Sequence, residues 1–145
     1  NASGVRGIRL KDNKDEVVGM ISVNDMDANI LVVSENGFGK RSSLEDYRLT
    51  NRGGKGVKTI SITEKTGKLV TLKSVSDNDD LMIINKSGIA IRMQVEDLRV
   101  MGRATQGVKV ISLKDGDSIA AVAKVMKDDD DLEDVNEIEF TGDTV

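Results

Sequence analysis

The stretch ILVVSENGFGKR at residues 30–41 decides the fold, because it returns 51 positions later as LMIINKSGIAIR at residues 81–92. Each copy is a run of branched apolar residues, a polar turn that ends in glycine, and a second strand-forming run. Gly37 and Gly88 supply the positive φ that a tight hairpin turn needs. Both stretches therefore predict β-hairpins.

The similarity between the two copies covers a whole unit. Residues 30–62 and the residues 51 positions later share 11 identities in 33 positions, including the tripeptides Gly56-Val57-Lys58 and Gly107-Val108-Lys109. An earlier partial copy, Gly7-Ile8-Arg9, precedes Gly56 by 49 residues. Repeats of about 40–50 residues are typical of propeller blades.

Local patterns predict strands and turns within each unit. Short runs rich in valine and isoleucine, separated by turn residues, indicate strands at 30–34, 38–42, 57–62, 69–75, 81–85, 89–93, 108–113 and 119–125. The connectors 43–46 and 94–97 are predicted to be single helical turns whose carboxylates cap the backbone or pair with arginine. We expect an all-β, propeller-like repeat of four-stranded antiparallel blades over residues 3–127, with two complete units and partial flanking ones that form an incomplete ring. A propeller takes about 4–8 blades to close, so the parent protein is expected to be longer.

Composition excludes many enzyme classes. The chain has 145 residues and contains no histidine, cysteine or proline. Catalytic triads with histidine, cysteine-histidine dyads, zinc sites built from these residues and disulfide frameworks therefore cannot form. No apolar run approaches the about 20 residues that a membrane span needs. We expect no catalytic residue, no metal site and no cofactor in this chain.

Charge divides the chain into two parts. All 21 basic residues lie in 1–127 beside 16 acidic ones, a net charge of +5, whereas 128–145 holds nine acids and no base, for an overall charge of −4. The tail has too little apolar content to fold alone, so we expect disorder there. It is either a solubilising end or a regulatory polyanion that competes with nucleic acid, with metal binding a third reading of its four consecutive aspartates, Asp128, Asp129, Asp130 and Asp131.

Basic residues recur at equivalent places in the two units. The stretch 36–58 has a net charge of +4 and its counterpart 87–109 a net charge of +2. Equivalent positions of a propeller lie on one side, so we expect a curved basic rim suited to a phosphate backbone. Aromatic residues make up only 2% of the chain, which favours duplex DNA over stacked single strands. The alternative is a solvated basic face without a nucleic-acid partner.

Three motifs carry a resemblance to a known family. GVRGIRL (4–10), NGFGKR (36–41) and GRATQGV (102–108) resemble the last blades of the C-terminal domain of the A subunit of bacterial DNA gyrase. The resemblance implies a β-pinwheel that wraps duplex DNA and so supports ATP-dependent negative supercoiling by the parent topoisomerase. It also implies a cytoplasmic, nucleoid-associated heterotetramer with two copies each of the A and B subunits, which uses ATP and magnesium. The chain itself is expected to be monomeric, and Tyr47, which aligns with Leu98, is expected to pack rather than act as a nucleophile.

The resemblance and the repeat together give the candidate DNA-binding residues. These are Arg6, Arg9, Lys40, Arg41, Arg48, Arg52, Lys55, Lys58, Arg92, Arg99, Arg103 and Lys109. Residues 52–56 match only part of the family's Gln-Arg-Arg-Gly-Gly-x-Gly box, and we interpret them as a degenerate copy of it. That departure leaves two alternatives open: the C-terminal domain of the topoisomerase IV A subunit, and a propeller scaffold that binds a protein. Salt dependence separates DNA binding from an apolar protein interface.

Overall fold

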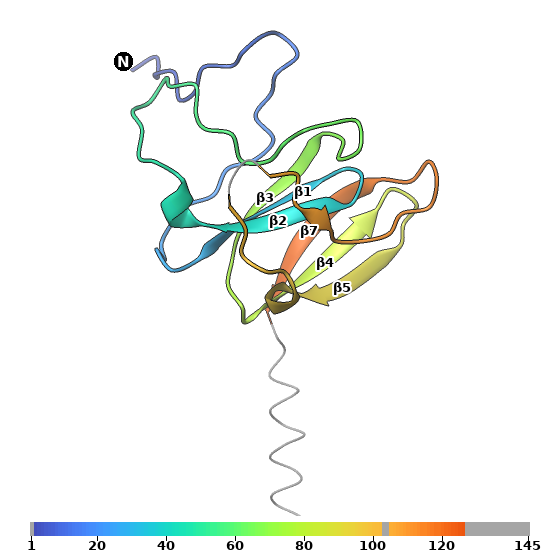
Figure 1. Cartoon of the computed structure of the whole chain (residues 1–145). Coiled ribbons are helices and arrows are strands. Elements are labelled where there is room, and N and C mark those ends of the chain that lie inside the picture. Colours follow the sequence, from blue (N-terminus) through green and yellow to red (C-terminus); the bar gives the residue numbers. More distant parts are fainter. Residues whose placement is uncertain (1, 103–104, 127–145) are drawn as a thin grey trace, which may run out of the picture.

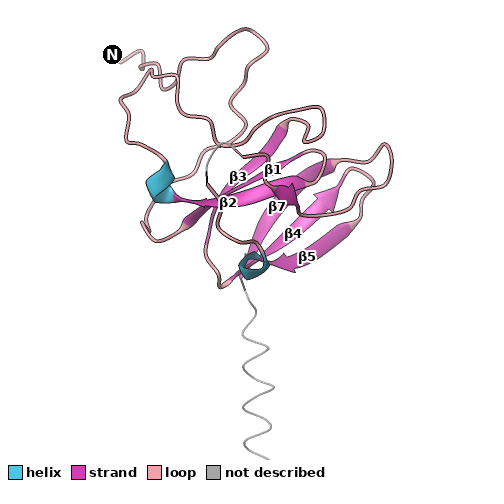
Figure 2. Ribbon diagram, in the orientation of Figure 1, coloured by secondary structure: helices cyan, strands magenta, loops and turns pink. Residues whose placement is uncertain are grey.

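The chain folds into two neighbouring antiparallel sheets in the computed structural model, which describes residues 2–102 and 105–126 (Figure 1). The elements, in chain order, are β1 (Asn29–Ser34), β2 (Phe38–Ser43), η1 (Leu44–Asp46), β3 (Leu69–Val75), β4 (Asp79–Asn85), β5 (Ala90–Gln94), η2 (Val95–Asp97), β6 (Val108–Lys109) and β7 (Ile119–Met126). The two short 3-10 turns are the only helical elements of the described part, and Figure 2 shows them in cyan beside the strands. The predicted all-β class and both predicted helical turns are confirmed.

Each sheet is built around one hairpin. The first sheet has the order β3-β1-β2-β6, with Val32 opposite Lys40 in the β1–β2 hairpin. The second has the order β5-β4-β7, with Ile83 opposite Ile91 in the β4–β5 hairpin, and so has three strands among the described residues where four are expected. The same hairpin and 3-10 turn thus occur once in each sheet.

A strand from the second unit completes the first sheet. β6 pairs with β2 through Phe38 and Lys109 and through Gly39 and Val108, and the Val110 N–H donates to the Gly37 carbonyl at 2.7 Å. The backbones come so close at Gly107 that a Cβ added there would lie 2.4 Å from the Gly39 carbonyl oxygen. Glycine at position 107 therefore allows β6, a strand of the second unit, to pair with the first sheet.

Two predicted strands differ from the structure. Residues 57–62 form no strand, because the described residues hold no hairpin ahead of β1 with which they could pair. The predicted strand 108–113 is reduced to β6, because beyond Val110 the partner strand β2 has already turned away at Gly37. Both differences arise because a strand needs backbone partners as well as a favourable sequence.

The core follows the alternation of side chains along β1. Leu31 and Val33 pack with Leu81 and Ile83 in a cluster between the two sheets. Ile30 and Val32 point to the other face, where they pack with Ile60 and half-buried residues such as Ile21 and Tyr47. The first sheet is therefore buried on both faces, which explains why β1 is an almost continuous apolar run.

Each hairpin tip is tied to the turn that precedes the last strand of its unit. In the first unit Asn36 Nδ2 donates to the Glu64 carbonyl at 3.1 Å. In the second, the Ser87 hydroxyl donates to the Asp117 carboxylate at 2.7 Å, and the Asn85 amide donates to it at 3.2 Å. The Ser87 hydrogen bond is the main reason that the pKa of Asp117 lies below its ordinary value, against a smaller opposing effect of desolvation.

Candidate nucleic-acid interface

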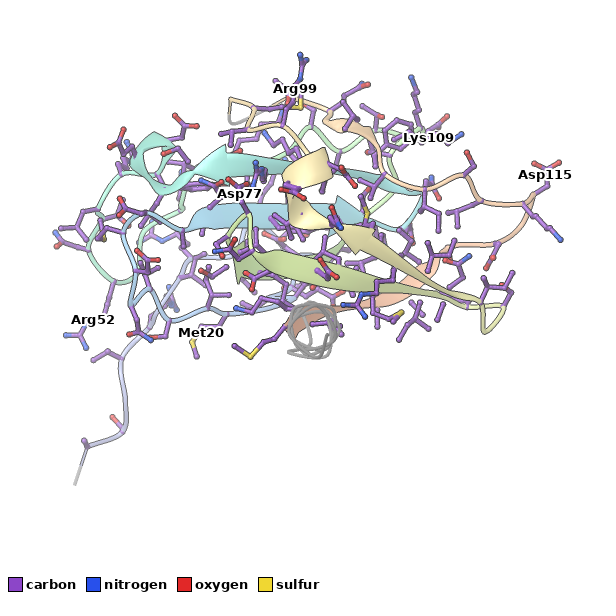
Figure 3. The ribbon with its side chains drawn as sticks, turned by 90° about the horizontal axis from the view of Figure 1, so that it is seen from below. Met20, Arg52, Asp77, Arg99, Lys109 and Asp115 are labelled. Atoms are coloured by element: carbon purple, nitrogen blue, oxygen red, sulfur yellow. The ribbon has the colours of Figure 1, made fainter. Side chains whose placement is uncertain are left out.

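Most of the predicted basic residues lie on the surface. The exposed ones are Arg6, Arg9, Arg48, Arg52, Lys55, Lys58, Arg92, Arg99 and Lys109. Figure 3 shows Arg52, Arg99 and Lys109 pointing outward from different parts of the two units. The exposed positive charge is therefore distributed over both units. Arg103 and the acidic tail 128–145 lie outside the described residues.

The first basic loop, residues 48–55, follows η1 and rests on the N-terminal segment. The Gly53 N–H donates to the Gly7 carbonyl, and the Arg9 N–H donates to the Gly54 carbonyl, both at 2.9 Å. Gly53 has a φ of 78°, a conformation that glycine adopts without strain. These contacts bring the RGGKG sequence beside the earlier partial repeat, which the sequence predicted only as a separate motif.

Cationic side chains gather where the first basic loop meets the N-terminal segment. Lys55 and Arg9 line one pocket together with Lys11 and Asp15. Asp15 accepts a hydrogen bond from the Lys11 backbone N–H at 3.0 Å and places one acid among these cations. The sequence prediction omitted Lys11, although its place two residues after Arg9 in the partial repeat could have indicated it. The pocket offers three cations to an anionic ligand.

The second basic loop, described at residues 99–102 and 105–106, crosses the first unit in a similar way. The Met101 N–H donates to the Arg41 carbonyl at 2.8 Å, and the Ser61 N–H donates to the Thr105 carbonyl at 2.9 Å. Arg41 and Val100 also form a parallel bridge. Each basic loop thus belongs to one unit and is held by backbone hydrogen bonds to the segment before it.

Two of the predicted contacts with DNA need correction. The Lys40 side chain is fully buried, with an exposure of 0%, and its Nζ donates to the Gly102 carbonyl at 2.7 Å. The Arg41 side chain is 8% exposed and forms an ion pair with Asp77 at 2.5 Å. Both side chains lie inside because β2 is covered by β6 and by the second basic loop. Neither can reach a phosphate in this arrangement.

Arg92, the repeat equivalent of Arg41, keeps more of its surface. Its side chain is 44% exposed and forms an ion pair with the buried Asp80 at 2.7 Å. Its guanidinium faces solvent on one side and a carboxylate on the other, so part of its charge is already compensated. Arg92 is therefore a weaker candidate for a phosphate contact than Arg52 or Arg99.

The described residues contain no cluster of three or more metal-ligating side chains. Tyr47 is half-buried in the second core cluster, and its hydroxyl is hydrogen-bonded to the Thr59 hydroxyl, as expected for a packing residue. Within the described ranges, no helix has the length and apolar character needed to span a membrane.

Comparisons with known proteins agree with the repeat. The family described as "DNA gyrase C-terminal domain, beta-propeller" matches residues 1–24, 28–76 and 79–126, so that the second and third segments begin 51 residues apart. The chain is 47% identical over 146 residues to the DNA gyrase A subunit of Staphylococcus aureus strain NCTC 8325, covering 99% of this chain and 16% of that protein. It is 45% identical over 130 residues to the DNA gyrase A subunit of Staphylococcus epidermidis strain ATCC 12228, covering 89% of this chain and 14% of that one.

Solved structures show the same arrangement. A DNA gyrase A C-terminal domain superposes with a TM-score of 0.78 at 31% identity, covering 85% of this chain and 41% of the solved one. The C-terminal domain of DNA topoisomerase IV superposes with a TM-score of 0.79 at 21% identity, covering 95% of this chain and 43% of that one, which shows a shared fold. The chain spans less than half of each solved domain. Since the family match extends over most of its residues, the chain belongs to the DNA gyrase C-terminal β-propeller family.

Proposed function

We propose that this chain is part of the duplex-DNA-binding and wrapping module of the A subunit of DNA gyrase, which is a type IIA topoisomerase. The observation that carries the proposal is the recurrence of a basic loop after each 3-10 turn, held on the preceding segment by backbone hydrogen bonds. Loops fixed in this way present cations at repeated intervals, which suits a phosphate backbone and requires no base sequence. Family membership supports the same reading.

The parent complex would supply the chemistry. We propose that ATP hydrolysis, magnesium and strand passage reside in the rest of the A subunit and in the B subunit, with two copies of each, in the bacterial cytoplasm on the nucleoid. The residues of this chain would bind and bend the DNA segment that is passed, and so bias the product toward negative supercoils. No described residue of this chain is proposed to act in catalysis.

Arginine substitutions test the binding part of this proposal. Arg52→Ala and Arg103→Ala should weaken binding to unrelated duplexes by similar factors, since both residues are assigned to phosphates. Each lost contact should lower the slope of log affinity against log salt by about 0.9. Lys114→Ala, which changes an exposed lysine outside both basic loops, is the control and should leave the slope nearly unchanged. A loss confined to one DNA sequence would contradict the phosphate assignment.

Wrapping needs a separate measurement. If the chain bends DNA around itself, closing a nicked plasmid in its presence should shift the linking number in proportion to the bound protein. Binding without such a shift would leave the binding proposal standing and refute wrapping by this chain. Affinity for the plasmid that does not change with salt would refute phosphate binding.

A further inference from the structure

We propose that Lys40 is a positioning residue for the second basic loop: it holds residues 99–102 in place for DNA and does not contact DNA itself. This inference rests on the proposed function for its consequence on binding, but its structural basis is independent. The sequence placed Lys40 among the DNA-binding residues, and its burial assigns it a different role.

The loop is fixed to β2 at three consecutive residues. Val100 bridges Arg41, the Met101 N–H donates to the Arg41 carbonyl at 2.8 Å, and the Gly102 carbonyl accepts from Lys40 Nζ at 2.7 Å. Of these three contacts, only the bond from Lys40 is made by a side chain. Gly102 itself is exposed and has no neighbour within 4 Å of a Cβ built on it. The Arg41 and Lys40 contacts, together with the bond from the Ser61 N–H to the Thr105 carbonyl, hold the loop at this point.

The position of Lys40 along β2 explains why a side chain is needed. β6 pairs only with Phe38 and Gly39, and beyond them the second basic loop takes over the outer edge of β2. The loop does not continue the ladder as a regular strand, and the Gly102 carbonyl accepts from two side chains, Lys40 Nζ at 2.7 Å and the Thr105 hydroxyl at 3.4 Å. Burying a lysine side chain restricts its rotamers and removes an ammonium from water, and both effects oppose burial. The hydrogen bond to Gly102 offsets part of that cost.

The repeat shows that this anchor is specific to the junction of the two units. The equivalent of Lys40 in the second unit is Ile91, which is 40% exposed and has no side-chain donor. The neighbouring cation is retained, as Arg41 and Arg92. Arg41 contacts the β3–β4 connection, which joins the units, through its ion pair with Asp77. Lys40 and Arg41 thus hold two segments that pass between the sheets, the second basic loop and the β3–β4 connection.

The consequence concerns the exposed arginine of the loop. Arg99 lies three residues before Gly102 and one before Val100, so fixing this stretch to β2 restricts the backbone from which the Arg99 side chain extends. Ordering that is already present in the free protein does not oppose DNA binding. Removing the Lys40 donor should therefore weaken DNA binding by about three- to tenfold, the range that corresponds to ordering one side chain.

Hydrogen exchange tests the anchor without DNA. Lys40→Met keeps the length and apolar stem of the side chain but removes its donor. The Met101 amide should exchange at least about tenfold faster in Lys40→Met than in the unchanged protein, since its bond to Arg41 loses lateral support. Lys109→Met, on the exposed strand β6, is the matched control and should leave Met101 exchange unchanged. If Lys40→Met fails to fold, Lys40→Gln, which retains a neutral donor, replaces it and should show a smaller increase.

A double-mutant cycle tests the link to DNA. If Lys40 acts through the loop, Lys40→Met should reduce DNA affinity much less when Arg99 is already alanine, because the contact between Arg99 and DNA has then been removed. Equal costs in both backgrounds, with a lower salt slope, would show a direct phosphate contact and overturn the proposal. Unchanged Met101 exchange in a folded Lys40 variant would also overturn it. Loss of Met101 protection in a protein that shows no salt-dependent DNA binding would support the anchor and refute the proposed function.

Discussion

Replacing Gly107 by alanine should weaken the pairing of β6, a strand of the second unit, with β2 in the first sheet. Gly107 has a φ of 76°, and a Cβ added there would lie 2.4 Å from the Gly39 carbonyl oxygen and 2.9 Å from its carbon. Its repeat equivalent, Gly56, has nearly the same φ of 81°, but its nearest neighbour is the Ile8 Cδ1 at 3.9 Å. The pair therefore separates the cost of the backbone conformation from the cost of the contact between units.

The magnitudes follow from these two environments. A left-handed conformation costs an alanine about 1–2 kcal/mol, and this applies to both positions. At Gly107 the clash is with backbone, so β6 must move away from β2, which adds about 1–3 kcal/mol of overpacking and weakens the hydrogen bond from Val110 to Gly37. We expect losses of about 1–2 kcal/mol for Gly56→Ala and about 3–5 kcal/mol for Gly107→Ala, from the sum of these effects.

Thermal and urea unfolding measure the difference. At about 4 °C per kcal/mol, the melting temperature should fall by about 4–8 °C for Gly56→Ala and by about 12–20 °C for Gly107→Ala. Gly102→Ala, whose φ is not positive and whose Cβ would meet no atom within 4 Å, serves as the neutral control. Equal shifts in melting temperature for Gly56→Ala and Gly107→Ala would refute the reasoning, because the close approach of Gly107 to Gly39 would then add nothing to the loss of stability.

Two further predictions concern charge. Asp117→Asn should lower the free energy of unfolding at neutral pH. The hydrogen bond from Ser87 keeps the folded pKa of Asp117 below its ordinary value of 3.8. The stability that the Asp117 carboxylate contributes is therefore present above pH 3.8 and is lost as the pH falls through the folded pKa. Urea unfolding at several pH values checks this, and a difference between the two proteins that stays constant down to about pH 2 would contradict it. Replacing the acidic tail 128–145 by a neutral Gly/Ser tail of equal length should tighten DNA binding and steepen its salt dependence, because nine acids no longer compete for a body of net charge +5. A scrambled acidic tail should restore weak binding, and equal affinity and equal slope for all three tails at low salt would leave the acids as a solvated end.

Sequence periodicity predicted the hairpins and turns well because these are local structures. β3 spans residues 69–75 as predicted, and β1, β2, β4, β5 and β7 lie within two residues of their expected limits. Branched apolar residues, glycine turns and the 51-residue repeat all act over short distances along the chain. The same information could not show which unit supplies the fourth strand, because that depends on contacts between residues about 70 positions apart, such as Gly39 and Val108.

The charged residues of β2 show a second limit of sequence reasoning. Lys40 and Arg41 stand next to each other in a motif that resembles exposed basic positions, and adjacent strand residues point to opposite faces, so one of them would normally face solvent. In the structure both are buried, because separate segments cover β2: β6 and the second basic loop on its outer edge, and the β3–β4 connection through Asp77. Burial that results from a neighbouring unit leaves no local signal in the sequence.

The contacts of β6 and of the basic loops with the preceding part of the chain determine how the DNA-binding surface is built. Each basic loop carries its own cations, but the backbone that orients them rests on the segment before it, through Gly7 and Arg9 for the first loop and through Lys40, Arg41 and Ser61 for the second. Stability in such an array is a sum of unit and nearest-neighbour terms. A substitution at the junction of two units should therefore loosen the cations of the following unit while leaving those of its own unit in place, so that the DNA path is disturbed on one side of the substitution only.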